Sequence, residues 1–287
     1  MAWWFGLVLL AIPAMASAGG ELVPLSFRWT DMEGHAREIA VELPADDIER
    51  DRAELTRLPS DELYAHTREA VLAFARSVPS GVLVAKESEE RLIIEPLVDD
   101  ATARPWLERI GQVREEATDT WLAERRFRRN RSGRVTFDLA SLVVDYADDV
   151  SPVAEQLRAM SGSRRRFVDL ALSFVQSIPY DEEGGFHRPL ALLARNSGDC
   201  DSKVVLFLAL VRAAYPDIDI AVLYAPGHAL AGVALPRGGS DWGIRYGGVD
   251  YLYAEPVGPT QNRLGERGQV AARTAQRAEV QPVPFPR

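Results

Sequence analysis

The sequence predicts an α+β protein in which a cysteine-bearing helix packs on an antiparallel sheet, after a separate N-terminal α+β domain. Apolar residues recur at helical spacing over residues 163–177. Strand-like runs over 220–224, 229–235 and 251–254 follow one another closely in the second half of the chain. Between these two features Cys200, the only cysteine, opens a long apolar helix-like segment.

The first 18 residues are expected to be a secretory signal peptide. Residues 2–15 are almost wholly apolar, and Ala16-Ser17-Ala18 has the small-residue pattern of a cleavage site. The apolar run is shorter than the ~18 residues that a membrane-spanning helix requires. The segment lacks Lys and Arg, so an uncleaved anchor is the alternative. Cleavage after Ala18 predicts a periplasmic or secreted protein without a membrane span.

The composition fits an exported globular protein. A formal net charge of −9 makes nucleic acid an unfavourable partner. One cysteine cannot form an internal disulfide, and a free thiol outside the cytoplasm is open to oxidation, so a functional role explains it best. One Cys with scattered His residues lacks zinc-ligand spacing, and we expect no metal and no cofactor.

Residues 19–150 are expected to form the N-terminal α+β domain. The pattern predicts a β-hairpin over 21–45, a helix from Ser60 to about Val78, strands over 82–85 and 92–97, and a helix with a stripe of Trp106, Ile110, Val113, Ala117 and Trp121. The stripe is expected to face the core rather than a ligand groove. Arginines over 125–134 close this helix and are expected to be solvated, with an anionic polymer or lipid surface as the alternative.

The boundary between the domains is placed near residue 150. Residues 135–146 are expected to be a strand and a loop, and Ser151-Pro152 marks the start of a new helix. Residues 151–260 then form the second domain. Its clearest helix, 163–177, stops before Pro179. The tail, 261–287, is expected to be largely disordered, with an edge strand over 280–283 as the alternative.

Cys200 is the candidate nucleophile. The N–H groups and the dipole at a helix N-terminus favour a thiolate and predict a lowered thiol pKa. Asp199 and Asp201 flank the cysteine; they are expected to cap the helix rather than to bind Ca²⁺, which needs more oxygen ligands. As anionic neighbours they raise the thiol pKa, so an imidazole must offset them.

His228 and Glu255 supply the two other groups that nucleophilic cysteine catalysis needs. His228 follows Cys200 by 28 residues and opens a strand, and Glu255 follows His228 by 27 residues and ends one. A base that exchanges the thiol proton and a carboxylate that orients the base complete a triad. His187 is the rival base, but no strand or tight turn fixes it.

These residues resemble the bacterial transglutaminase-like branch of the papain-like cysteine enzymes. The resemblance is carried by Gly198-Asp199-Cys200-Asp201-Ser202-Lys203, by Gly227-His228 and Glu255-Pro256, and by the upstream stretches 174–180 and 189–193. It covers roughly residues 150–260. It implies a papain-like core, a Cys200-His228-Glu255 triad, and Gln176 as an oxyanion donor together with the Cys200 N–H. Cys200 lacks a following Trp, and Glu replaces the more usual Asp.

The resemblance implies an exported cysteine enzyme that acts on amide bonds of peptides or proteins, with cell-envelope substrates within reach. Attack by Cys200 forms an acyl-enzyme; resolution by water gives a peptidase or amidase, and resolution by an amine gives a transamidase. The alternative is a non-catalytic module that binds a peptide or protein in the same groove. A third reading is a lone redox thiol.

Overall fold

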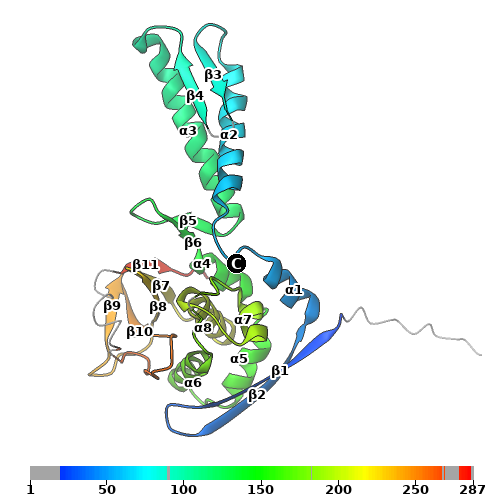
Figure 1. Cartoon of the computed structure of the whole chain (residues 1–287). Helices are drawn as coiled ribbons and strands as arrows, with labels where there is room; N and C mark the ends of the chain where they lie inside the picture. Colours follow the sequence, from blue (N-terminus) through cyan, green and yellow to red (C-terminus); the bar gives the residue numbers. More distant parts are fainter. Residues whose placement is uncertain (1–19, 89–90, 182, 267, 269–277, 286–287) are drawn as a thin grey trace, which may run out of the picture.

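The computed structural model describes residues 20–88, 91–181, 183–266, 268 and 278–285. The fold is α+β with antiparallel sheets, as the sequence predicts. A rounded body carries a long arm that projects from it (Figure 1). The expected signal peptide, residues 1–18, lies outside the described residues.

The N-terminal hairpin lies on the body. Strands β1 (Leu22–Thr30) and β2 (Ala36–Pro44) pair antiparallel and lead into helix α1 (Ala45–Ala53). Phe27 and Trp29 point inward, and each ring centroid lies 5.3 Å from that of Phe174 in the second half of the chain. The Trp29 indole N–H also donates to Ser173 Oγ at 3.1 Å. The hairpin therefore belongs to the same core as the second half.

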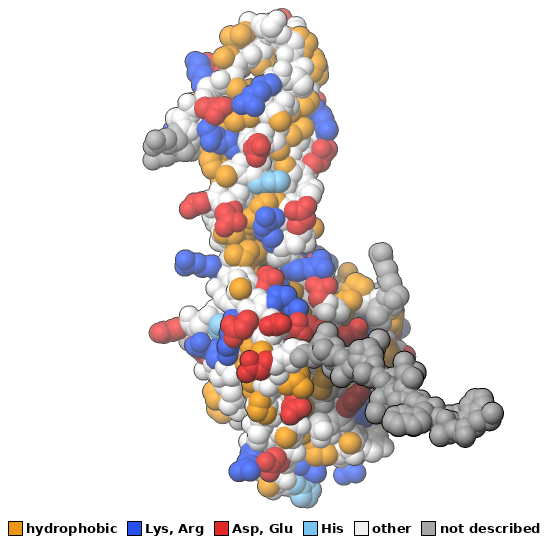
Figure 2. Space-filling model, turned by 90° about the vertical axis from the view of Figure 1, so that its right-hand side faces the viewer, with side chains coloured by type: hydrophobic (Ala, Val, Ile, Leu, Met, Phe, Trp, Pro, Cys, Tyr) orange, Lys and Arg blue, Asp and Glu red, His pale blue; other side chains and the backbone are white. Residues whose placement is uncertain are grey.

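The arm consists of two antiparallel helices with a β-hairpin at the tip (Figure 1). Its elements are α2 (Ser60–Ser77), β3 (Leu83–Glu87), β4 (Leu92–Pro96) and α3 (Asp100–Glu124). At its root, Trp121 and Leu122 are buried in the body core. Charges of both signs alternate with hydrophobic side chains along the arm (Figure 2).

The root of the arm contains a short hairpin and a helix. Strands β5 (Phe127–Arg129) and β6 (Val135–Phe137) precede α4 (Leu139–Tyr146). The expected loop within 135–146 is wrong, because the Asp138 carboxylate accepts the Ser141 N–H and caps α4. The arginine cluster lies largely in the hairpin instead of closing a helix: Arg126 pairs with Asp145 at 2.6 Å and Arg128 with Glu279 at 2.6 Å.

Helix α8 (Cys200–Ala214) occupies the centre of the body, and its residues from Val204 to Leu210 are fully buried. It packs against α4, against α5 (Ser151–Ala159), against α6 (Arg164–Ser177) and against the main sheet, while α7 (Pro189–Arg195) precedes it. The expected helix over 163–177 is α6, with Ser163 as its cap.

The main sheet has five strands, all antiparallel, in the order β11-β7-β8-β10-β9. They are β7 (Ile220–Ala225), β8 (His228–Val233), β9 (Gly243–Tyr246), β10 (Val249–Ala254) and β11 (Glu279–Pro282). The expectation of a largely disordered tail is wrong for β11. This strand pairs with β7, and its Val280 is buried.

The core does not divide near residue 150. One cluster of buried side chains extends from Phe27 to Val283 and includes α4, α8 and the sheet. The separate part is the arm, inserted between α1 and β5. No helix in the described residues is long and apolar enough to cross a bilayer.

Candidate active site

A tight turn places Cys200 at the first position of α8. The Asp199 carboxylate caps the helix, accepting the Ser202 N–H at 2.8 Å, as the sequence predicts. A Cβ at Gly198, before it, would lie 2.8 Å from Leu192 Cδ1, so a larger residue there would displace that side chain. The Gly198 N–H donates to the Pro179 carbonyl and its own carbonyl accepts the Asp181 N–H, so the segment after α6 holds the turn.

His228 is held by the two-residue connection between β7 and β8. Ala225 pairs with His228, so Pro226 and Gly227 form the turn between the paired residues. Gly227 has φ of +71°, which glycine adopts without the penalty that a Cβ brings. The Pro-Gly sequence therefore directs the His228 side chain.

Glu255 follows directly after β10 and meets His228 through the register of the sheet. Ala254 pairs with Ala231 at the end of the ladder between β10 and β8, so Glu255 leaves the sheet close to the start of β8. His228 Nε2 lies 3.0 Å from Glu255 Oε1 and 2.9 Å from Oε2. Both side chains are nearly buried, with 13% and 9% of their surface exposed.

Cys200 reaches the same place through the strand that carries His228. Its Sγ accepts a hydrogen bond from the N–H of Ala229, the residue after His228. With Nε2 of His228 bonded to Glu255, the imidazole keeps Nδ1 for proton exchange. The structure thus pairs His228 with Glu255 and places the Cys200 thiol against the backbone of the residue that follows His228.

The environment of the thiol keeps it protonated. Burial raises the pKa of Cys200 to about 12, and the charges of Asp201 and Asp199 add to the shift. The expected lowering of the thiol pKa is therefore wrong for this structure, because burial and two carboxylates outweigh the helix N-terminus. Burial together with Asp199 also raises the pKa of Asp201 to about 6, and the nearby His228 opposes that shift.

The side-chain amide of Gln176 is bonded to the backbone, which leaves no free donor for an oxyanion. Its Nε2 donates to the backbone carbonyls of Glu255 at 2.7 Å and Asn262 at 3.1 Å, which engages both amide protons. A Cβ on Gly258 would lie 2.0 Å from the Gln176 carbonyl oxygen, so the chain after Glu255 passes directly over it. Gln176 fixes the segment that carries Glu255, and the oxyanion assignment is corrected accordingly.

Lys203 is a residue near the site to which sequence reasoning gave no role. It lies one turn after Cys200 on α8, is fully buried, and donates through Nζ to the Ile178 carbonyl. Burial lowers the pKa of Lys203 to about 8, and the charge of Glu255 opposes this shift. The position of this lysine directly before the apolar run of α8 was the sequence feature that could have indicated its burial.

His187, the rival base, lies against Ser202 in the first turn of α8. Its backbone N–H donates to Ser202 Oγ at 2.8 Å, and its buried Nε2 has no hydrogen-bond partner in the structure. Burial lowers the pKa of His187, the Arg195 charge adds to the shift, and Asp199 opposes it. The residue that Glu255 orients is His228.

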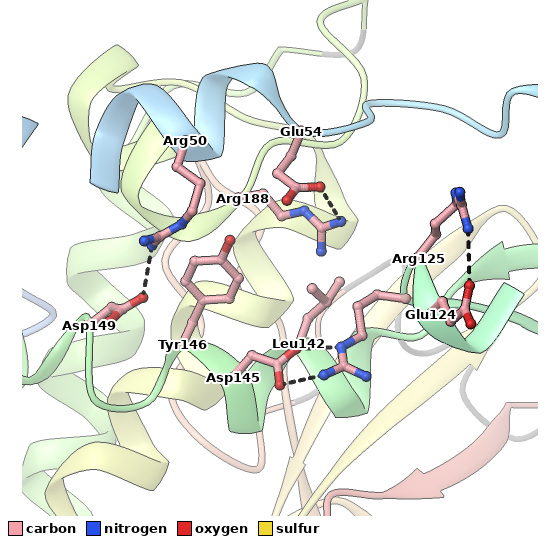
Figure 3. Close-up of a pocket in the computed structure, with 10 residues that line it drawn as sticks. Arg50, Glu54, Glu124, Arg125, Leu142, Asp145, Tyr146, Asp149 and Arg188 are labelled. Atoms are coloured by element: carbon pink, nitrogen blue, oxygen red, sulfur yellow. Dashed lines mark hydrogen bonds and ion pairs between the residues drawn. The ribbon is translucent and has the colours of Figure 1, made fainter. Parts of the chain in front are cut away.

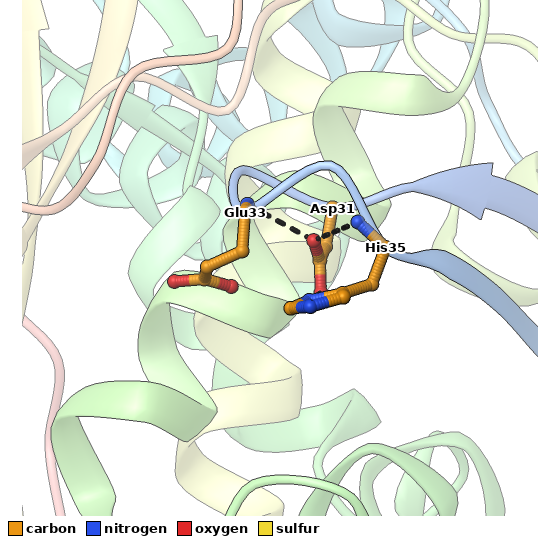
Figure 4. A group of neighbouring side chains, drawn as sticks. All are labelled: Asp31, Glu33 and His35. Atoms are coloured by element: carbon orange, nitrogen blue, oxygen red, sulfur yellow. Dashed lines mark hydrogen bonds and ion pairs between the residues drawn. The ribbon is translucent and has the colours of Figure 1, made fainter.

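One group with possible metal ligands occurs among the described residues: Asp31, Glu33 and His35, in the turn between β1 and β2 (Figure 4). The Asp31 carboxylate already accepts the Glu33 and His35 N–H groups, both at 2.9 Å, and the Arg37 Nε–H at 2.7 Å. These bonds show that the Asp31 carboxylate stabilises the turn between β1 and β2, which explains why the three residues lie together.

Comparison of the chain with protein-family models, with curated proteins and with solved structures found no match. The chemistry of the site is accordingly derived from the geometry of Cys200, His228 and Glu255.

Proposed function

We propose that this protein is a cysteine enzyme of the transglutaminase-like type, with a papain-like core, that acts on amide bonds of peptides or proteins. The observation that supports the proposal is the His228–Glu255 pair, together with a thiol at the start of α8 that lies against the Ala229 N–H, next to His228 in the chain. A nucleophile, a base and a carboxylate that orients the base converge from three elements. That convergence supports catalysis more than any one of the residues does.

The reaction begins with attack of Cys200 Sγ on an amide carbonyl. His228 takes the thiol proton at Nδ1 as the S–C bond forms, and Glu255 stabilises the resulting imidazolium through Nε2. His228 then returns the proton to the amide nitrogen as the C–N bond breaks. The products are a thioester on Cys200 and a free amine.

The protonated state of the resting thiol determines the kind of catalysis. A thiol with a pKa of about 12 does not form a stable thiolate–imidazolium pair at neutral pH. Proton transfer to His228 therefore accompanies attack, as in general-base catalysis of a hydroxyl nucleophile. Substrate contacts near Asp201 that reduce its negative charge lower the barrier further.

The oxyanion is stabilised by the start of α8. The first N–H groups of a helix have no partner within the helix, so the Cys200 N–H is a suitable donor to the developing charge. Water then releases the acyl group in a peptidase or amidase, and an amine releases it in a transamidase. Export through the N-terminal segment would give access to peptides of the cell envelope.

The raised thiol pKa favours a second candidate, a module that binds a peptide or protein without cleaving it. A binding groove does not need a reactive thiolate. It also does not need a carboxylate against Nε2 of an imidazole, which argues for the enzyme.

An activated acyl donor tests the proposal directly. The mature chain is incubated with a short N-acetylated peptide p-nitrophenyl ester, and intact mass is recorded over time. An acyl group on Cys200 is expected, with p-nitrophenol released in a burst. Cys200→Ala abolishes the mass increase and His228→Ala slows it at least 100-fold, within the range expected for general-base catalysis.

His66→Ala, a change on arm helix α2 away from the three active-site residues, is the matched control and leaves the acylation rate unchanged. Acylation at equal rates in wild type and His228→Ala contradicts the enzyme, because the imidazole would then play no part. Failure of folded wild type to acylate contradicts it as well, and the binding module then takes its place.

A further inference from the structure

The root of the arm has an open polar cavity of about 780 Å³, apart from the three active-site residues. Its walls come from α1, the C-terminal end of α3, α4 and the residue before α7 (Figure 3). The charged lining residues are Arg50, Arg125, Arg126 and Arg188, with Glu54, Glu124, Asp145 and Asp149. The lining thus carries equal numbers of cations and carboxylates. A cavity of this volume can hold a small ligand.

Arg188 is the least satisfied of these groups. Its side chain is only 5% exposed, its Nε has no hydrogen-bond partner in the structure, and its one ion pair is with Glu54 at 3.5 Å. The guanidinium lies over Phe137 and Phe186, at 5.8 and 5.5 Å from the ring centroids. The aromatic rings hold it in place and leave its donors in need of an anion, since a buried cation is costly without one.

The buried acid near Arg188 is already engaged. Asp51 accepts the Tyr146 hydroxyl at 2.7 Å and the Leu190 N–H at 2.9 Å, so it caps α7 from α1. Its two oxygens are thereby occupied. An external carboxylate is a suitable partner for the guanidinium of Arg188 where it lines the cavity, because a carboxylate matches the guanidinium fork.

The other side of the cavity has an excess of negative charge. Asp149 is paired only loosely, with Arg50 at 3.5 Å, and Arg50 bonds more closely to Asp47 at 2.5 Å. Burial raises the pKa of Asp149, and the charges of Asp47, Asp148 and Asp145 oppose the effect of Arg50. Asp149 and Arg188 lie on opposite sides of the Tyr146 ring in Figure 3.

We propose that this cavity binds a small zwitterion, an amino acid or a short peptide with free ends, whose carboxylate lies on Arg188 and whose ammonium group lies on Asp149. A simple anion such as phosphate fits less well, because four carboxylates surround it. The site is independent of Cys200, so it holds whether or not the protein is an enzyme.

The test uses L-alanyl-L-alanine as the probe and isothermal titration calorimetry as the measurement, on the full chain with Cys200→Ser to prevent turnover. The dipeptide is expected to give a saturable heat. N-Acetyl-L-alanyl-L-alanine lacks the ammonium group and L-alanyl-L-alaninamide lacks the carboxylate; each, like inorganic phosphate, binds at least tenfold more weakly. Arg188→Gln weakens the dipeptide at least tenfold.

Asp149→Asn, at a partly exposed position, weakens the dipeptide and leaves the acetylated analogue unchanged. The Asp149→Asn variant therefore tests the dipeptide site even if Arg188→Gln does not fold. Arg109→Gln, on an exposed arm arginine paired with Glu116, is the matched control and leaves binding intact. His228→Ala also leaves it intact. No saturable heat, equal affinity for the single-charge analogues, or loss of binding in His228→Ala overturns the proposal, the last because it places the dipeptide at the thiol.

Discussion

Cys200 and Asp201 are sequence neighbours whose side chains touch on the first turn of α8, with Sγ 3.6 Å from Asp201 Oδ1. The thiol also accepts the Ala229 N–H, which favours its anion, yet its pKa is raised to about 12. Burial is the largest cause and the Asp201 charge the next. After burial, the charge of Asp201 is therefore the group that most strongly opposes ionisation of the candidate nucleophile.

Asp201→Asn is expected to make the thiol more acidic. The change removes the charge and keeps the shape, so the rate of alkylation by iodoacetamide at pH 8.5 rises by about tenfold, one pKa unit. Intact mass measures the rate. Asp217→Asn, on an acid with 60% of its side chain exposed, is the control and has no effect. An unchanged rate in Asp201→Asn means that burial alone keeps the thiol protonated.

Asp201 also makes stability depend on pH. Its folded pKa of about 6 exceeds the ordinary value of 3.8, so the folded protein holds this proton more tightly than the unfolded chain. The stabilisation is complete below the unfolded pKa of 3.8 and is lost as the pH rises through about 6, with a size of roughly 3 kcal/mol. Urea unfolding of wild type and Asp201→Asn from pH 3.5 to 7.5 measures it. Parallel curves for the two proteins contradict the prediction.

Local patterns in the sequence predict the elements that carry the site. The period of α6, the cap at Asp199 and the Pro226-Gly227 turn each depend on residues a few positions apart. The positions of His228 and Glu255 then suffice to predict that these two meet, because an antiparallel sheet brings the start of β8 beside the end of β10.

The failures of sequence reasoning involve partners that are distant in the chain. Helix α4 is buried because it packs against α8. Strand β11 is held in the sheet by pairing with β7 and by the ion pair between its Glu279 and Arg128. Gln176 has the side-chain amide that an oxyanion donor needs. Only the path of the chain after Glu255 shows that this amide already donates to backbone carbonyls. The thiol pKa depends on burial, which no spacing along the sequence reveals.

Gly227→Ala is expected to destabilise the protein by about 1 kcal/mol, because alanine is strained at positive φ. The same change should slow acylation of Cys200, since the turn directs His228. Gly111→Ala is the control: it lies within α3 with open space around it, and we expect about 0.5–1 kcal/mol of stabilisation there. Urea unfolding measures both. Equal effects of the two changes contradict the role of the turn.

Gln176→Leu removes the two hydrogen bonds that hold the segment around Glu255. The backbone carbonyls of Glu255 and Asn262 lose their donor in a buried place, at a cost of roughly 1–3 kcal/mol. Gln112→Leu, on the exposed face of α3, is the matched control and changes stability little. Chemical denaturation gives both values. A Gln176→Leu protein of wild-type stability contradicts the positioning role.

Lys203 supplies a prediction at high pH, and the sign follows from its buried charge. Its folded pKa of about 8 lies below the ordinary 10.5, so between these values the unfolded chain holds a proton that the folded protein has lost. Stability therefore rises with pH over this window, by roughly 3 kcal/mol. Lys203→Met removes the rise.

Lys86→Met is the control for this change, because Lys86 is the other lysine in the chain and is 57% exposed beside Glu95. It keeps the rise. Urea unfolding between pH 7.5 and 10.5 compares the three proteins. Because Glu255 opposes the shift, Glu255→Gln lowers the folded pKa of Lys203 further and moves the start of the rise to lower pH. If stability begins to rise at the same pH in Glu255→Gln as in wild type, Glu255 does not act on the charge of Lys203, and the prediction is contradicted.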